Sequence, residues 1–166
     1  MRQDDAFSLH SNLFWRIIWY IVVGVALYWV GNVVAVFPWL ISRTLGIIAM
    51  IASTLLWAYV AFYCLRHVQK SEWNMYALFM ASIFLATAAV QDYFLYAVYR
   101  GIPDELYVTS TFIAYGLVFA LPFIVRLIMR NYQQKAILVV SLQKIGIAFL
   151  IGVVSFLITI WSIRYW

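Results

Sequence analysis

Apolar residues follow one another along this chain in long stretches, and short polar segments separate the stretches. The apolar stretches cover about 14–37, 43–65, 73–99, 104–129 and 145–163. Each is long enough for the ~20 residues that an α-helix needs to cross a hydrocarbon layer. None alternates strictly between polar and apolar positions, as the strands of a membrane barrel do. The pattern therefore predicts five transmembrane helices, the first ended by Pro38.

The connection between the third and fourth stretches, "YRGIPDE", carries the signals of a helix end followed at once by a helix start. Gly101 suits the left-handed conformation that often follows a helix C-terminus, and Arg100 complements the negative end of the helix dipole. Pro103 is tolerated in a first helical turn, where Asp104 and Glu105 complement the positive end. We expect the third and fourth helices to form a tight antiparallel hairpin.

The segment 131–144, "NYQQKAILVVSLQK", mixes polar and apolar positions. It is either a loop or interfacial amphipathic helix, or an extension of the fifth helix from which Lys144 reaches out to water. Because residues 145–163 already suffice to span a membrane, we favour the loop or interfacial helix.

Composition strengthens the membrane prediction. Of the 166 residues, 67% are hydrophobic and 10% are charged, whereas a soluble domain has about 25% charged and about 45–50% apolar residues. A 19.3 kDa chain is too small to bury so much apolar surface in one core. We expect an all-α integral membrane bundle that forms a single domain over 1–166, with the lipid bilayer as its main partner.

Charge predicts the orientation of this bundle. Five crossings place eight basic residues with the N-terminus and three on the other side, and cytoplasmic segments are enriched in Lys and Arg. The two sets are Arg2, Arg16, Arg66, Lys70, Arg126, Arg130, Lys135 and Lys144 against Arg43, Arg100 and Arg164. We expect the N-terminus in the cytoplasm and the C-terminus outside, in a plasma membrane such as the bacterial inner membrane. The net charge of +5 is scattered rather than gathered in a stripe, so nucleic acid is not an expected partner.

A Gln–Asp pair interrupts the third apolar stretch, and ionisable residues inside a membrane usually face protein or water. With this topology, polar side chains from four helices fall at one level toward the outer face. These residues are Asn32, Gln91, Asp92, Tyr96, Thr109, Thr111 and Thr159. The sequence predicts that they line a polar recess that binds a ligand. The alternative is a packing role for Asp92, held by interhelical hydrogen bonds of about 1 kcal/mol each.

Motifs for catalysis and cofactors are absent from the sequence. One cysteine and two histidines give no disulfide, zinc set or haem ligation. There is no HExxH, GxSxG, P-loop or dinucleotide fingerprint. Five of the six acids lie in polar segments, which leaves no carboxylate pair inside the apolar stretches for acid–base chemistry. We expect no catalytic residues, no metal and no cofactor.

These observations leave three functions open. The favoured one is non-enzymatic binding or transport of a small polar ligand, a proton or a cation in the polar recess. The second is a structural subunit or assembly factor that packs on another membrane protein or forms a homo-oligomer through small-residue helix faces. The third is a lipid-modifying enzyme, which would need a second acid or a nucleophile beside Asp92.

Overall fold

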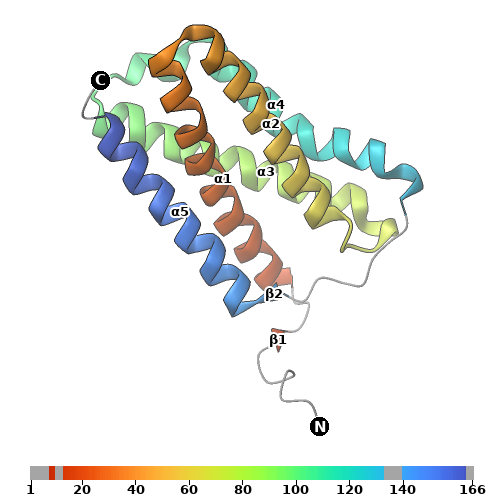
Figure 1. The fold of residues 1–166 in the computed structure, drawn as a ribbon. Helices are drawn as coiled ribbons and strands as arrows, with labels where there is room; N and C mark the ends of the chain where they lie inside the picture. The colour runs from red at the N-terminus through yellow and green to blue at the C-terminus, as the bar shows by residue number, and fades with distance from the viewer. Residues whose placement is uncertain (1–7, 10–12, 133–139, 164–166) are drawn as a thin grey trace. The chain divides into compact units, whose positions relative to one another are not determined.

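The computed structural model describes residues 8–9, 13–132 and 140–163. Five α-helices make up most of this part of the chain (Figure 1). They are α1 (Leu13–Ile41), α2 (Arg43–Leu65), α3 (Trp73–Asp92), α4 (Thr109–Ile128) and α5 (Leu142–Ile163). The described residues contain five helices long and apolar enough to cross a membrane. The predicted all-helical architecture with five candidate membrane-spanning helices is therefore confirmed.

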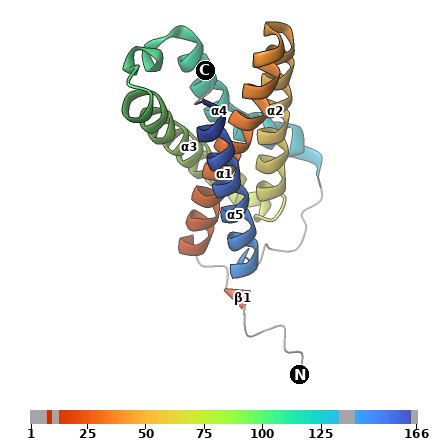
Figure 2. The same cartoon turned by 60° about the vertical axis from the view of Figure 1, so that its left-hand side comes forward.

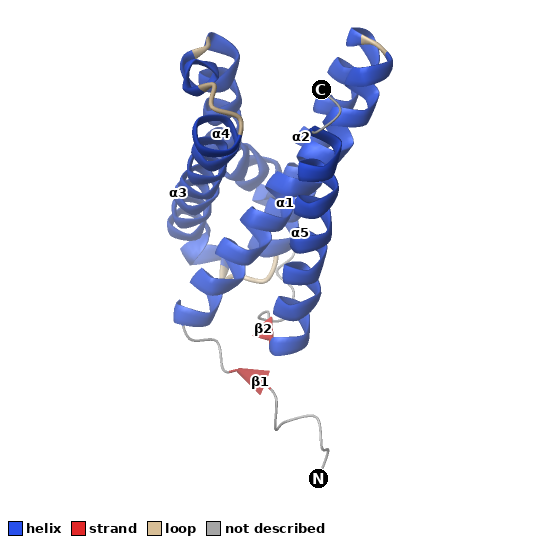
Figure 3. Cartoon of the chain, turned by 90° about the vertical axis from the view of Figure 1, so that its left-hand side faces the viewer, coloured by secondary structure: helices blue, strands red, loops and turns tan. Residues whose placement is uncertain are grey.

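Short elements join these helices, and within the described residues loops are confined to brief connections (Figure 3). A π-helix, η3 (Tyr93–Tyr99), continues α3, and 3₁₀-helices form η2 (Lys70–Glu72), η4 (Pro103–Tyr107) and η5 (Met129–Asn131). Two strands of two residues each, β1 (Ser8–Leu9) and β2 (Val140–Ser141), pair antiparallel. The sequence pattern did not predict these strands, because two residues carry no detectable alternation.

The predicted end of the first helix at Pro38 is wrong. Helix α1 continues through Pro38 to Ile41, and the Ser42 backbone N–H donates to the Pro38 carbonyl at 3.0 Å. Proline lacks an N–H, but its fixed φ is helical. Pro38 therefore costs α1 one hydrogen bond without forcing the backbone to leave the helix. Helix α2 begins and ends where the sequence predicts.

The start of the fourth helix also differs from the prediction of residue 104. Pro103–Tyr107 form the 3₁₀-helix η4, and Val108 is extended, with φ −75° and ψ 148°. An extended residue cannot continue a helix, so α4 begins only at Thr109. In the ambiguous segment 131–144, Leu142–Lys144 form the first turn of α5, and residues 133–139 lie outside the described residues.

Contacts divide the chain into two compact units, which we describe separately. The first unit comprises residues 1–56 and 136–166, and the second comprises residues 57–135. In the first unit, α1 packs along α5 (Figure 2). A Cβ atom at Gly152 would lie 3.2 Å from Ala26 Cα, and the rings of Trp29 and Phe156 meet edge to face at 4.8 Å. The contacts advance in the same direction along both helices, so α1 and α5 are parallel.

The second unit is built on the α3–α4 hairpin, with the end of α2 against α3. Phe84 of α3 is 1% exposed, and its ring meets that of Trp57 at 5.1 Å. Gly101 has φ +67°, so the predicted left-handed turn after the third helix is confirmed. The chain reverses there, which places α3 and α4 side by side and antiparallel.

Candidate functional site

Asp92 is the last residue of α3, and its side chain is half-buried. The hydroxyl of Tyr115, on α4, donates a hydrogen bond to the Asp92 carboxylate. Tyr96, four residues after Asp92, lies close enough to Tyr115 to interact with it electrostatically. We call Asp92, Tyr96 and Tyr115 the aspartate–tyrosine cluster. It brings one carboxylate and two phenols from both arms of the hairpin to one place.

The backbone changes its hydrogen-bonding pattern directly after Asp92. Residues Tyr93–Tyr99 form a π-helix, and the Arg100 N–H donates to the carbonyl of Leu95, five residues back, at 3.0 Å. The Ile102 N–H donates to the Tyr96 carbonyl at 2.8 Å. Segments of π-helix are rare and frequently occur at functional sites. This one separates Asp92 from the turn at Gly101.

Gln91 is 8% exposed, and its amide Nε2 donates to the Thr87 carbonyl at 2.9 Å. Its other atom, Oε1, is buried and has no hydrogen-bond partner among the described residues. A buried acceptor without a partner costs about 1–3 kcal/mol. Neighbouring side chains on an α-helix point about 100° apart, so Gln91 shares a level with Asp92 but faces another side of α3.

The two predicted threonines of the fourth helix differ in position. Thr109 is exposed in the first turn of α4. Thr111 is half-buried, and it lies four residues before Tyr115, a spacing that puts two side chains on one face of a helix. Of these two, Thr111 is therefore the one placed on the side of α4 that meets Asp92.

Asn32 and Thr159 belong to the first unit. Asn32 Nδ2 donates to the Tyr28 carbonyl at 3.0 Å. Thr159 is 1% exposed, and its hydroxyl donates to the Ser155 carbonyl at 2.9 Å. Each polar group is thus satisfied by its own helix. A meeting of these residues with Asp92 would join the two units, and it stays a prediction.

Sequence reasoning missed Tyr115 because a tyrosine in an apolar helix looks like a core or interfacial residue. A signal was nevertheless present. Residues 92 and 115 are placed almost symmetrically about the connection 100–108 between the two helices, since their midpoint is 103.5, between Pro103 and Asp104. In a tight antiparallel hairpin, residues equidistant from the turn come to the same level. That symmetry would have singled out Tyr115 as a partner of Asp92.

The Asp92–Tyr115 contact also fixes the place of Arg126 relative to the cluster. Arg126 lies 11 residues beyond Tyr115 on α4 (126 minus 115), or about 16 Å along the axis at ~1.5 Å per residue. At that distance Arg126 and Asp92 cannot form an ion pair. Arg100 is the nearer cation, because its guanidinium lies 5.5 Å from the centre of the Tyr96 ring.

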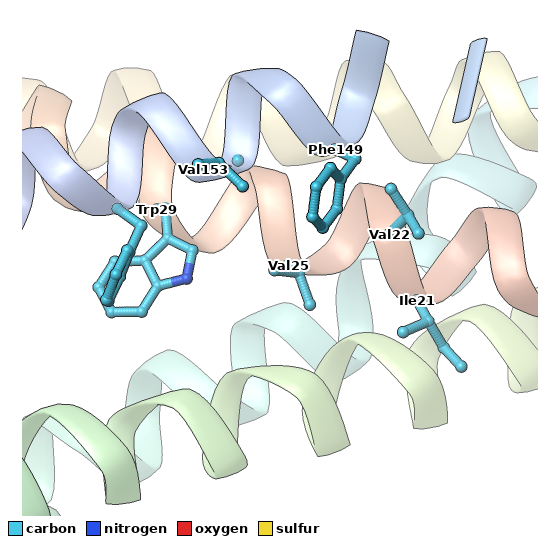
Figure 4. A pocket seen from close by; sticks show the side chains of 8 residues that line it. Ile21, Val22, Val25, Trp29, Phe149 and Val153 are labelled. Atoms are coloured by element: carbon cyan, nitrogen blue, oxygen red, sulfur yellow. The ribbon is translucent and has the colours of Figure 1, made fainter. Parts of the chain in front are cut away.

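A second feature is an apolar groove in the first unit, with a volume of about 320 Å³, between α1 and α5 (Figure 4). Its lining residues are Ile21, Val22, Val25, Trp29, Phe149, Gly152, Val153 and Phe156. The indole nitrogen of Trp29 is the one polar side-chain atom among these residues. Such a lining suits an acyl chain or an apolar side chain and offers no charge to a polar ligand.

Among the described residues, no three His, Cys, Asp or Glu side chains gather into a group that could hold a metal ion. Comparisons with protein families, with curated proteins and with solved structures find no match for this chain. The geometry of the aspartate–tyrosine cluster is therefore the strongest indication of function in this chain.

Proposed function

We propose that this protein is a non-enzymatic membrane protein that binds, or carries across the membrane, a small polar ligand, a proton or a cation at the aspartate–tyrosine cluster. One observation carries the proposal. The Asp92 carboxylate ends an α-helix inside a candidate membrane span and receives a hydrogen bond from Tyr115 of the neighbouring helix. An ionisable residue in a span is costly and is by default a functional candidate.

The chemistry of the cluster supports these ligand classes. A carboxylate and two phenols supply only oxygen atoms, which suit hard cations and exchangeable protons. Arg100, exposed beside Tyr96, would serve the anionic part of a small zwitterionic ligand. The π-helix after Asp92 supports the same site, because such segments are rare and frequently occur at functional sites.

The proposed topology places the cluster toward the non-cytoplasmic face. The excess of Lys and Arg favours a cytoplasmic N-terminus, and the parallel course of α1 and α5 suits an odd number of crossings. With this orientation, the turn at Gly101 lies outside, in a plasma membrane such as the bacterial inner membrane.

The test compares Asp92→Asn with Asp104→Asn, which makes the same chemical change at an exposed position of the same hairpin. Each protein is reconstituted in vesicles that contain a pH-sensitive dye, and the internal pH is followed after an imposed pH, Na⁺ or K⁺ gradient. The unmodified protein and Asp104→Asn should respond to at least one gradient, and Asp92→Asn should not.

Binding without transport has its own readout. Carboxyl infrared bands of the reconstituted protein should shift with pH or cation concentration, and Asp92→Asn should lose that shift. If Asp92→Asn matches the unmodified protein in both assays, the proposal is overturned. A partner that co-purifies in mild detergent with both proteins would then favour the structural-subunit alternative.

A further inference from the structure

Four basic residues gather at the end of the second unit where α2 and α4 finish. Arg66 follows the last residue of α2, Lys70 begins η2, Arg126 lies in the last turn of α4, and Arg130 lies in η5. We call these four residues the basic end.

An aromatic contact joins the two helix ends. The rings of Phe62, one turn before Arg66, and Tyr132, two residues after Arg130, meet edge to face at 5.1 Å. The basic residues of α2 and α4 are therefore brought to one region, although about 60 residues separate them in the sequence (Arg66 to Arg126).

Aromatic rings hold Arg66 in place. Its guanidinium lies 4.6 Å from the centre of the Tyr63 ring and 5.9 Å from that of Phe62. Its Nε donates to His67 Nε2 at 3.1 Å. This arrangement orients the guanidinium but, among the described residues, uses only one of its five N–H donors. The other four are free of partners in this part of the chain and can recognise an anion.

Arg126 supplies an unsatisfied donor at the same end. Its Nε is buried and has no hydrogen-bond partner among the described residues. A guanidinium matches the geometry of phosphate oxygens, which can accept two parallel N–H bonds. Leu127 and Ile128, which follow Arg126, are 61% and 78% exposed, so exposed apolar surface is present at the same level of α4.

We propose that the basic end binds the phosphate of an anionic phospholipid. The four cations lie at the ends of candidate spans, which is the level of lipid headgroups, and Lys70 also lies 5.8 Å from the Trp73 ring centre. Aromatic residues are typical of that level. Exposed Leu127 and Ile128 would contact the acyl chains of the lipid. The site is separate from the aspartate–tyrosine cluster and does not depend on its function.

The test is native mass spectrometry of the full-length protein in detergent, titrated with phosphatidylglycerol or with phosphatidylcholine of the same acyl chains. The unmodified protein should retain phosphatidylglycerol preferentially. The double variant Arg66→Gln/Arg126→Gln should lose this preference roughly thirty-fold, because each of the two basic residues near a membrane surface contributes about 1 kcal/mol.

Arg43→Gln is the matched control, since it removes one positive charge at the opposite end of α2 and should leave the preference unchanged. A second double variant, Lys70→Gln/Arg130→Gln, changes only exposed side chains, so it should fold normally and also weaken retention. Equal retention by both double variants and the unmodified protein would overturn the proposal, as would an equal loss in Arg43→Gln.

Inorganic phosphate distinguishes a lipid from a free anion. Added at the same concentration as phosphatidylglycerol, it should neither bind detectably nor displace the lipid. Displacement of the lipid by inorganic phosphate would show a site for soluble phosphate and would contradict the proposal of a lipid site.

Discussion

The contact between α1 and α5 at Gly152 gives the sharpest test of the packing in the first unit. We expect Gly152→Ala to destabilise the protein, although alanine is the better helix former. Gly146→Ala, six residues earlier on the same helix, is the matched control. A Cβ atom at Gly146 would meet nothing within 4 Å, whereas at Gly152 it would meet Ala26 Cα at 3.2 Å and Ala26 Cβ at 3.5 Å.

The geometry sets the expected magnitude. Carbon atoms attract each other best at about 3.5–4.0 Å, so a Cβ at 3.2 Å requires the helices to separate by a few tenths of an ångström. The obstacle is the Cα of Ala26, which a change of side-chain rotamer cannot move. Overpacking of this kind costs about 1–3 kcal/mol, and replacement of glycine in a helix offsets up to about 1 kcal/mol of it. We therefore expect a net loss of about 1 kcal/mol for Gly152→Ala.

The measurement is equilibrium unfolding in mixed micelles, in which increasing dodecyl sulfate is followed by tryptophan fluorescence. Trp29 contacts Phe156 of α5 at 4.8 Å, so one of the eight tryptophans that contribute to the signal lies at this interface. Gly146→Ala should be equal in stability to the unmodified protein or up to about 1 kcal/mol more stable. If Gly152→Ala proves at least as stable as Gly146→Ala, the close approach of α1 and α5 is refuted.

Three further predictions concern the second unit. Gly101→Ala should destabilise the protein by about 1–2 kcal/mol in the same assay, because the φ of Gly101 is +67° and a residue with a Cβ atom is disfavoured there. A change below 0.3 kcal/mol, roughly the additivity error of such measurements, would contradict the left-handed conformation of this turn. In a double-mutant cycle, Asp92→Asn and Tyr115→Phe should be coupled by roughly 0.6–1.7 kcal/mol, and additive effects would exclude their hydrogen bond. Gln69→Cys should react with an impermeant thiol reagent only in opened cells, whereas Asp104→Cys should react in intact cells. Native Cys64 is buried and should not react. The reverse pattern would overturn the predicted orientation.

The helices were predictable because long apolar stretches between short polar segments are typical of helices that can span a membrane. Arg43 and Arg66 flank an uninterrupted apolar stretch, and α2 begins and ends at that stretch. The same pattern fails at Pro38, where the chain remains helical. A proline removes one N–H and creates a local clash, but whether the helix ends there depends on the tertiary contacts of the following residues. Those contacts leave no periodic signal in the sequence.

The candidate site was predictable only in part. Gln91 and Asp92 stand out because they interrupt an apolar stretch. The residues around Gly101 correctly predict a turn between two antiparallel helices, and this hairpin brings α4 beside Gln91 and Asp92. The π-helix could not be predicted, since its sequence, "YFLYAVY", is as apolar as the α-helix before it. A shift from one hydrogen-bond register to the next changes no residue type.

Asp92 differs from Asn32, Thr87 and Thr159 in how its polar atoms are satisfied. Asn32, Thr87 and Thr159 each donate to a carbonyl three or four residues back in their own helix, which is how a membrane helix hides a polar side chain. A carboxylate has no proton to donate and needs a donor from elsewhere, which Tyr115 supplies. Asparagine at position 92 could donate to the Ala88 carbonyl, as Asn32 donates to that of Tyr28, and would need no partner helix. A purely structural role is therefore met more simply by an amide, and the presence of an ionisable group favours a role in which its charge is used.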